Sequence, residues 1–88
     1  ARYRELATER VEQRIARTLL RLAAQGNKGR DVEMEYSRQD LAVMTGTTLF
    51  TVSRTLSEWE KSGLVEAGRE RIRIKDPDEL IKIADSSE

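Results

Sequence analysis

The sequence predicts an α+β fold with a three-helix core, a β-hairpin and a short C-terminal helix. The stretch from Ser37 to Gly63 holds two helical patterns separated only by Thr45-Gly46-Thr47, and a glycine can adopt the positive φ that a sharp turn demands. Two short alternating segments follow, Leu64–Ala67 and Arg71–Lys75, as expected for a hairpin. A short helix, a glycine-containing turn and a longer helix are typical of a helix-turn-helix. The hairpin, or wing, makes the predicted fold a winged helix-turn-helix.

The composition bounds the kind of protein this is. Eighty-eight residues suffice for one domain, and a hydrophobic fraction of 38% allows one modest core. Sixteen basic and sixteen acidic residues give a net charge of zero, so the arrangement of charge must decide whether nucleic acid is a partner. The absence of cysteine excludes a disulfide framework and a thiolate zinc site, and it suits a reducing cytoplasm.

Catalysis and membrane insertion both lack support in the sequence. Without histidine, the chain has neither the usual general base near neutral pH nor the commonest metal ligand. No nucleophile elbow, glycine-rich phosphate loop or metal-ligand cluster is present. No apolar run approaches the roughly 20 residues that span a bilayer, and no signal peptide is visible. We therefore expect a cytoplasmic protein that is not an enzyme, with no cofactor in this part of the chain and no membrane partner.

The first helix is expected from residue 1 to about residue 25, starting near Thr8 and stopped by Gly26. Its apolar stripe recurs every three or four residues at Val11, Ile15, Leu19 and Leu22. The chain opens inside this pattern without an initiator methionine, so residues 1–7 are interpreted as the end of a preceding linker or dimerisation helix and residues 8–84 as the domain. The rest of the surface of this helix is either solvated or contributes to contact with the DNA backbone. It carries Arg10, Arg14, Arg17 and Arg21.

A loop and a strand lead into the helix-turn-helix. Residues 25–31 are polar and contain two glycines, which predicts a loop, and Val32–Tyr36 alternates apolar and charged residues as a half-buried strand does. Ser37 can cap the next helix, and Asp40 can reach back as in a capping box. The apolar side of that helix is expected to hold Leu41, Ala42 and Met44.

The second helix of the motif is expected over residues 48–62. Thr48 can serve as its N-cap, and Gly63 stands where a helix C-terminus favours a left-handed residue. Val52, Leu56 and Trp59 follow at i, i+4 and i+7, which places them on one buried face.

The wing and a last helix complete the chain. Leu64–Ala67 and Arg71–Lys75 should pair around Gly68-Arg69-Glu70, with Ile72 and Ile74 facing inward. Asp76 and Pro77 then give a cap and a first helical residue, and residues 85–88 are expected to fray. The apolar side of the last helix is expected to hold Leu80, Ile81 and Ala84.

The geometry of a helix-turn-helix indicates DNA binding. Its second helix presents N-terminal residues to base edges in the major groove, while the first crosses the backbone. The solvent-facing residues of the predicted second helix include Leu49, Phe50, Thr51, Ser53, Arg54 and Ser57. Arg54 is the single cation among them and suits bidentate contact with guanine O6 and N7. Its alternative role is a surface ion pair with Glu58.

Phosphate contacts are expected around this helix. Arg38 and Gln39 open the first helix of the motif, where long polar side chains can meet phosphates. The hydroxyls of Thr48 and Thr51 can do the same, although their alternative role is capping. The wing is either a phosphate-binding basic edge or a solvated hairpin. It holds Arg69, Arg71, Arg73 and Lys75 against Glu70.

The chain resembles the C-terminal DNA-binding domain of the Crp/Fnr superfamily of transcription regulators, to which the cyclic-AMP receptor protein belongs. The likeness covers residues 8–75 and rests on Arg14-Ile15-Ala16-Arg17-Thr18-Leu19-Leu20, Ser37-Arg38-Gln39-Asp40-Leu41-Ala42, Thr45-Gly46, Thr51-Val52-Ser53-Arg54, Leu56 and Gly63-Leu64-Val65. It implies that Arg54 reads guanine and Ser53 makes a neighbouring groove contact. It also implies phosphate contacts by Arg38, Gln39, Thr48 and Thr51.

The resemblance also implies partners. Members are homodimers in which an N-terminal β-roll senses an effector, often a cyclic nucleotide, and a long helix dimerises. Neither element is in this sequence. Double-stranded DNA is the expected partner. RNA polymerase and a second copy of the chain, bound through the missing N-terminal region, are the other expected partners.

Leu49 and Phe50 depart from the family pattern. Many members carry polar base readers here, commonly a glutamate at the position of Phe50. Apolar side chains cannot accept a hydrogen bond from cytosine, but they can touch thymine methyl groups. The alternative is that they pack against the β-roll or another protein, which would make the domain a protein-interaction module with both residues as its apolar anchor.

Overall fold

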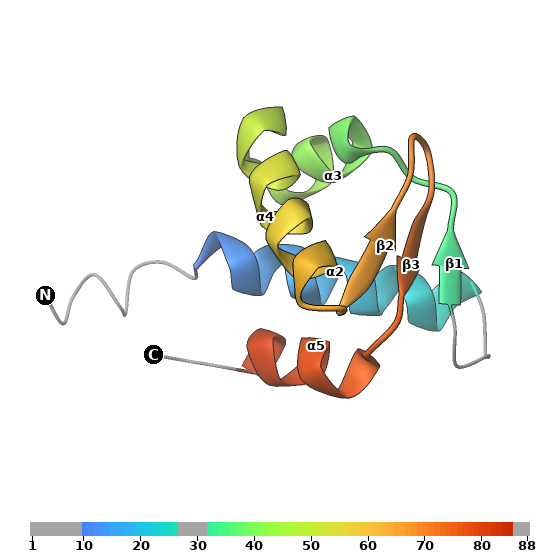
Figure 1. Cartoon of the computed structure of the whole chain (residues 1–88). Coiled ribbons are helices and arrows are strands. Elements are labelled where there is room, and N and C mark those ends of the chain that lie inside the picture. Colours follow the sequence, from blue (N-terminus) through green and yellow to red (C-terminus); the bar gives the residue numbers. More distant parts are fainter. Residues whose placement is uncertain (1–9, 27–31, 86–88) are drawn as a thin grey trace, which may run out of the picture.

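The computed structural model describes residues 10–26 and 32–85. Helix α2 (Val11–Gly26) crosses the molecule, with α3 (Arg38–Thr45) above it and α5 (Pro77–Asp85) below it in Figure 1. It packs against α3, α5 and strand β1 (Val32–Met34). Its buried side chains include Ile15 and Leu19, both fully inaccessible, as the apolar stripe predicts.

The helix-turn-helix is closed by the caps that the sequence predicts. The Asp40 N–H donates to Ser37 Oγ (3.0 Å) and the Ser37 N–H donates to Asp40 Oδ2 (2.9 Å), which confirms the capping box. Gly46 ends α3 with a φ of 70°. Helix α4 (Leu49–Lys61) then begins at Thr48, whose Oγ1 accepts from the Thr51 N–H (3.1 Å). The range 48–62 is confirmed, with its first and last residues as caps.

The wing belongs to a three-stranded antiparallel sheet with the order β1-β3-β2. Strands β2 (Val65–Ala67) and β3 (Ile72–Ile74) form the predicted hairpin. Strand β1 pairs with the other edge of β3, so Glu33 and Glu66 both lie opposite Arg73. The predicted strand Val32–Tyr36 ends earlier, at Met34.

One hydrophobic cluster joins all of these elements. Val52, Leu56 and Trp59 of α4 are buried as predicted, as are Ile72 and Ile74 of the wing. Because α4 and the sheet rest on the same core, the exposed half of α4 is fixed relative to the wing.

Two expectations about apolar faces are wrong. Met44 is 40% exposed, and Thr45 takes the buried position because it lies one helical turn after Leu41, whose carbonyl accepts from the Thr45 hydroxyl. Ile81 is 44% exposed. Leu80 and Ala84, four residues apart, share the buried face of α5, and Ile83 packs beside them.

The ends of the predicted helices also differ. Helix α2 begins at Val11 and includes Gly26, whereas Arg10 lies outside it and its N–H donates to Gln13 Oε1 (3.2 Å). Thr8 and the linker proposed for residues 1–7 lie outside the described residues. Helix α5 is capped by Asp76, whose Oδ1 accepts from the Glu79 N–H (3.2 Å), and includes Asp85. The rest of the expected frayed tail, residues 86–88, is also outside the described residues.

Candidate nucleic-acid interface

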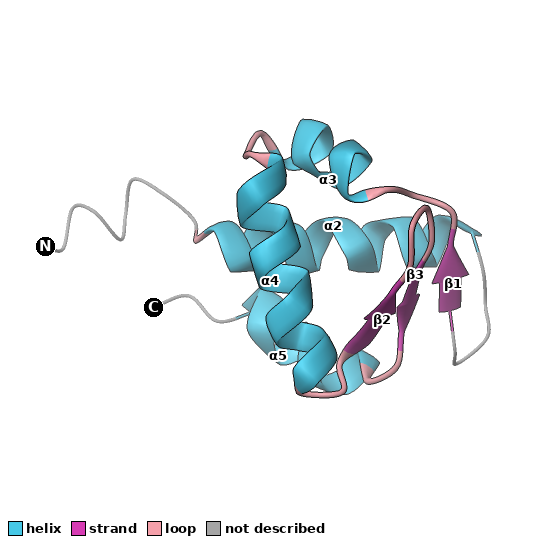
Figure 2. Ribbon diagram, turned by 45° about the horizontal axis from the view of Figure 1, so that its top comes forward, coloured by secondary structure: helices cyan, strands magenta, loops and turns pink. Residues whose placement is uncertain are grey.

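Helix α4 lies in front of α2 in Figure 2, and its N-terminal half has an exposed side opposite its buried residues. Phe50 is 73% exposed and Leu49 is 47% exposed. Ser53, Arg54 and Ser57 follow at helical spacing on the same side; Ser53 is half-buried and the other two are exposed. This set of five residues is referred to as the reading face. It combines a large apolar area with one positive charge.

Arg54 lies over an aromatic ring. Its guanidinium carbon is 5.9 Å from the centroid of the Phe50 ring, within the range of a cation–π contact. Although Glu58 stands one turn later, the described residues show no ion pair between it and Arg54. The guanidinium therefore keeps its hydrogen-bond donors available for an acceptor outside the chain.

Exposed apolar side chains also flank the turn between α3 and α4. Val43 is 72% exposed, and Met44 joins it at the end of α3, opposite Leu49 and Phe50 at the start of α4. Val43 and Met44 were not predicted as part of a functional surface. The exposed apolar surface around this turn therefore includes more residues than the two that the sequence indicates.

The predicted phosphate-contacting residues occupy different environments. Arg38 Nη1 donates to the Gly68 carbonyl oxygen (3.0 Å), so this side chain links the start of α3 to the turn of the wing. Gln39 is exposed. The Thr48 hydroxyl donates to Thr51 Oγ1 (3.0 Å), in addition to accepting from the Thr51 backbone. Thr48 is thus the cap of α4 and Thr51 its partner, and contact of either with phosphate stays a prediction.

Two arginines of α2 act as links between helices, which sequence reasoning missed. Arg14 Nε donates to the Thr45 carbonyl oxygen at the end of α3 (2.9 Å). The negative end of the helix dipole also stabilises a cation at this position. Arg17 Nε donates to the Ala84 carbonyl oxygen in α5 (3.0 Å). No local sequence pattern predicts such contacts, because the residues lie 31 and 67 positions apart.

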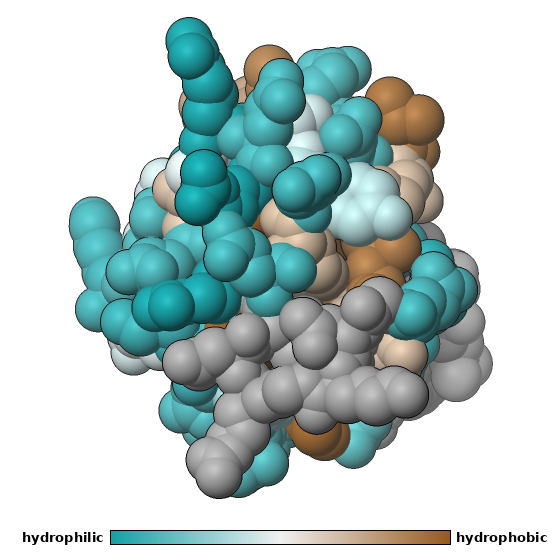
Figure 3. Space-filling model, turned by 90° about the vertical axis from the view of Figure 1, so that its right-hand side faces the viewer, coloured by the Kyte–Doolittle hydropathy of each residue, from teal (hydrophilic) through white to brown (hydrophobic). Residues whose placement is uncertain are grey.

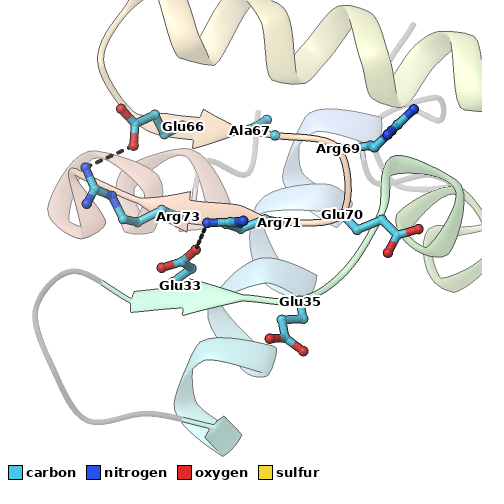
Figure 4. Close-up of a pocket in the computed structure, with 9 residues that line it drawn as sticks. Glu33, Glu35, Glu66, Ala67, Arg69, Glu70, Arg71 and Arg73 are labelled. Carbon is cyan, nitrogen blue, oxygen red and sulfur yellow. Dashed lines mark ion pairs between the residues drawn. The ribbon is translucent and has the colours of Figure 1, made fainter.

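Two arginines of the wing are already paired with glutamates. Arg71 Nη1 lies 3.1 Å from Glu33 Oε2, and Arg73 Nη2 lies 3.0 Å from Glu66 Oε1 (Figure 4). Glu35 and Glu70 line the same shallow outer surface. Hydrophilic residues predominate on this side of the molecule (Figure 3). The positive surplus expected from the wing sequence is therefore largely cancelled by its neighbours.

The turn of the wing is held at two points. Besides the Arg38 contact, the Ala67 N–H donates to Glu60 Oε2 near the end of α4 (3.1 Å). Arg69 projects from the turn and is exposed. Among the described residues, it makes no hydrogen bond or ion pair, so it is the wing arginine best placed to meet a phosphate.

Other kinds of site find no support in the described ranges. Residues 10–26 and 32–85 contain no group of three or more acidic side chains placed to hold a metal ion. Within the same ranges, no helix has the length and apolarity needed to cross a bilayer.

Comparison with known proteins identifies relatives of the whole domain. A Crp-like helix-turn-helix domain model matches residues 13–83. Electron transport regulator A of Shewanella oneidensis is 34% identical over 83 residues, which cover 90% of this chain and 33% of that protein. The transcriptional regulatory protein btr of Bordetella pertussis is 35% identical over 71 residues, covering 76% of this chain and 29% of that protein.

Solved structures agree with this grouping. A transcriptional regulator of the CRP/FNR family from Thermus thermophilus superposes with a TM-score of 0.84 at 27% identity, covering 99% of this chain and 46% of that one. The catabolite activator protein of the same species gives a TM-score of 0.74 at 31% identity, covering 84% of this chain and 33% of that one. The chain spans about a third of the length of the two curated relatives. By its sequence match and its fold, the chain belongs to the Crp-like helix-turn-helix domain family, the DNA-binding part of transcription regulators of the Crp/Fnr group.

Proposed function

We propose that this domain binds one half-site of a specific DNA sequence, with α4 in the major groove and α3 crossing the backbone. The observation that carries the proposal is the exposed start of α4, where Arg54 has no carboxylate partner among the described residues. Arginine in this position suits bidentate contact with guanine. Ser53 lies beside it as a second groove contact.

The surrounding residues would fix the position of α4 on the duplex. Gln39 and Arg69 are both exposed near the point where Arg38 contacts the wing turn, and they are assigned to phosphates together with Thr48 and Thr51. Two paired arginines are assigned the same role. Arg38 would contact phosphate from its place beside the wing, and Arg71 would do so by exchanging Glu33 for phosphate, since an exposed ion pair contributes only about 0–1 kcal/mol.

The larger protein would act as a homodimer in the cytoplasm, where its DNA target lies. Two copies of α4 would then meet a near-palindromic site about 34 Å apart, one helical turn of DNA. The same proposal includes an effector domain preceding this chain and RNA polymerase as a further partner. It also includes the absence of catalytic activity. The effector domain is supported by relatives that are two to three times longer than this chain.

Selection of duplexes from a random library at low salt tests the DNA-binding role. The preferred duplex should lose affinity steeply as salt rises, because phosphate contacts release counterions. Arg54→Ala should cost about 1–3 kcal/mol of binding and relax the preference at one base pair. Arg38→Ala should weaken binding to all sequences alike, and Lys82→Ala, which removes one positive charge from the exposed side of α5, serves as the control.

Two outcomes would contradict the proposal. If no duplex is enriched, the chain does not read DNA. If binding barely changes with salt, an apolar contact with another protein through Leu49 and Phe50 becomes the better explanation. Retention of wild-type preference by Arg54→Ala would remove that residue from the base contacts.

A further inference from the structure

The reading face has an unusual chemical content for a surface that contacts base edges. Of its five residues, two are apolar, two are serines and one is arginine, and none is a carboxylate or an amide. Asparagine or glutamine would be needed for bidentate contact with adenine, and a carboxylate for accepting from cytosine N4. The face therefore lacks the groups that recognise adenine and cytosine most directly.

The apolar area of the face does match one group in the major groove. Thymine carries a C5 methyl group, the apolar feature that distinguishes it there. Phe50 exposes 73% of its surface. Contact between this ring and a methyl group removes apolar surface from water and therefore stabilises the complex. Arg54 supplies the donors for guanine O6 and N7 on the same face.

The contact between the two side chains sets how far apart the two bases can be. The Arg54 guanidinium carbon and the Phe50 ring centroid are 5.9 Å apart, and successive base pairs are stacked about 3.4 Å apart. A guanine bound by Arg54 and a methyl group touching Phe50 should therefore lie close together along the duplex. The separation allows one or two steps along the duplex.

We propose that Phe50 is a specificity-determining residue that binds the methyl group of a thymine one or two base pairs from the guanine contacted by Arg54. This inference rests on the proposed DNA-binding function and names the half-site chemistry that it recognises. The guanidinium lying over the ring brings the two contacts together on one part of the reading face.

Replacing thymine with deoxyuridine removes this methyl group and keeps the base-pairing atoms. In the preferred duplex, the guanine of Arg54 is first located as the position where Arg54→Ala loses its preference. Each thymine within two base pairs, on either strand, is then exchanged for deoxyuridine. At one of these thymines, the exchange should weaken binding about three- to fivefold, which is the effect expected for the loss of one buried methyl group. Thymines four or more base pairs away serve as the DNA control.

Protein variants assign the effect to Phe50. In Phe50→Ala, the ratio of affinities for the thymine and deoxyuridine duplexes should fall to about one. Val43→Ala removes a side chain of similar exposure from the neighbouring helix and should keep the wild-type ratio. Both positions are on the surface, so thermal unfolding should show both variants folded.

The outcomes separate the two proposals. Equal wild-type affinity for thymine and deoxyuridine at every position within two steps, or an unchanged ratio in Phe50→Ala, would overturn the role of Phe50 while leaving DNA binding intact. A wild-type chain that enriches no duplex would instead overturn the DNA-binding function on which this inference rests.

Discussion

The exposed start of α4 and the wing differ in how their charges are used. On α4, Arg54 is exposed, lies over the ring of Phe50 and makes no hydrogen bond or ion pair through its side chain within the described residues. On the wing, Arg71 and Arg73 each pair with a glutamate of a neighbouring strand. Helix α4 thus keeps an unpaired cation on an apolar surface, whereas the wing neutralises these two arginines and leaves Arg69 exposed in the turn.

This difference shows that charge counted along a segment is a poor measure of charge available to a partner. The wing sequence suggests a basic edge, but the register of the sheet brings Glu33 and Glu66 to either side of Arg73. The single arginine of the reading face therefore has more freedom to bind DNA than the paired Arg71 and Arg73 of the wing. We expect sequence preference to depend on α4 and the wing to adjust overall affinity.

The largest expected effect comes from removing the support beneath α4. Leu56 is fully buried, and Leu56→Ala should lower the free energy of unfolding by about 2–5 kcal/mol because it leaves a cavity in the core. Ser57→Ala changes the exposed side of the same helix and should stay within about 0.5 kcal/mol. Chemical denaturation measures both, and equal effects would contradict the division of α4 into a buried and an exposed side.

A smaller effect is expected at the turn that precedes α4. Gly46 has a φ of 70° and space around an added Cβ, so Gly46→Ala should cost about 1–2 kcal/mol from backbone strain alone. In the wing turn, a Cβ on Gly68 would meet Arg71 atoms at ordinary contact distances, 3.8 Å and beyond. Gly68→Ala is therefore expected to change stability little. Thermal denaturation of both variants tests this contrast between the two turns.

The smallest effect on stability, with an informative effect on binding, is expected when the wing pairs are broken. Glu33→Gln removes the carboxylate beside Arg71, which should cost less than about 1 kcal/mol of folding stability because both side chains are largely exposed. The released guanidinium should strengthen binding to all duplexes and steepen the salt dependence by up to about one unit of slope. Glu12→Gln, the same change on α2, is the control. An unchanged slope would show that Arg71 does not reach phosphate.

The helix-turn-helix was the part of the fold most open to prediction. Ser37, Gly46 and Thr48 act through contacts within a few residues, so their roles can be read from local sequence. The burial of Val52, Leu56 and Trp59 follows from helical spacing. The order of the sheet and the links made by Arg14 depend on packing between distant segments, which a single sequence does not reveal.

The candidate site was predicted unevenly for the same reason. The exposure of Phe50 and Arg54 follows from the opposite, buried face of α4, so it could be predicted. Helical spacing also places Arg54 one turn after Phe50, although the choice between that ring and Glu58 as its neighbour needed coordinates. The charge on the wing could not be predicted, because it depends on which strand lies beside β3.

The two hydrogen bonds that hold the wing turn have a mechanical consequence. Arg38 links the Gly68 carbonyl to α3, and Glu60 links the Ala67 amide to α4, so both bonds oppose movement of the hairpin relative to the two helices. We expect the domain to bind DNA as a rigid body. Bending of the DNA, rather than movement of the protein, would then bring the DNA backbone to the wing. Sequences that bend easily at the wing would then be favoured without any base being touched there.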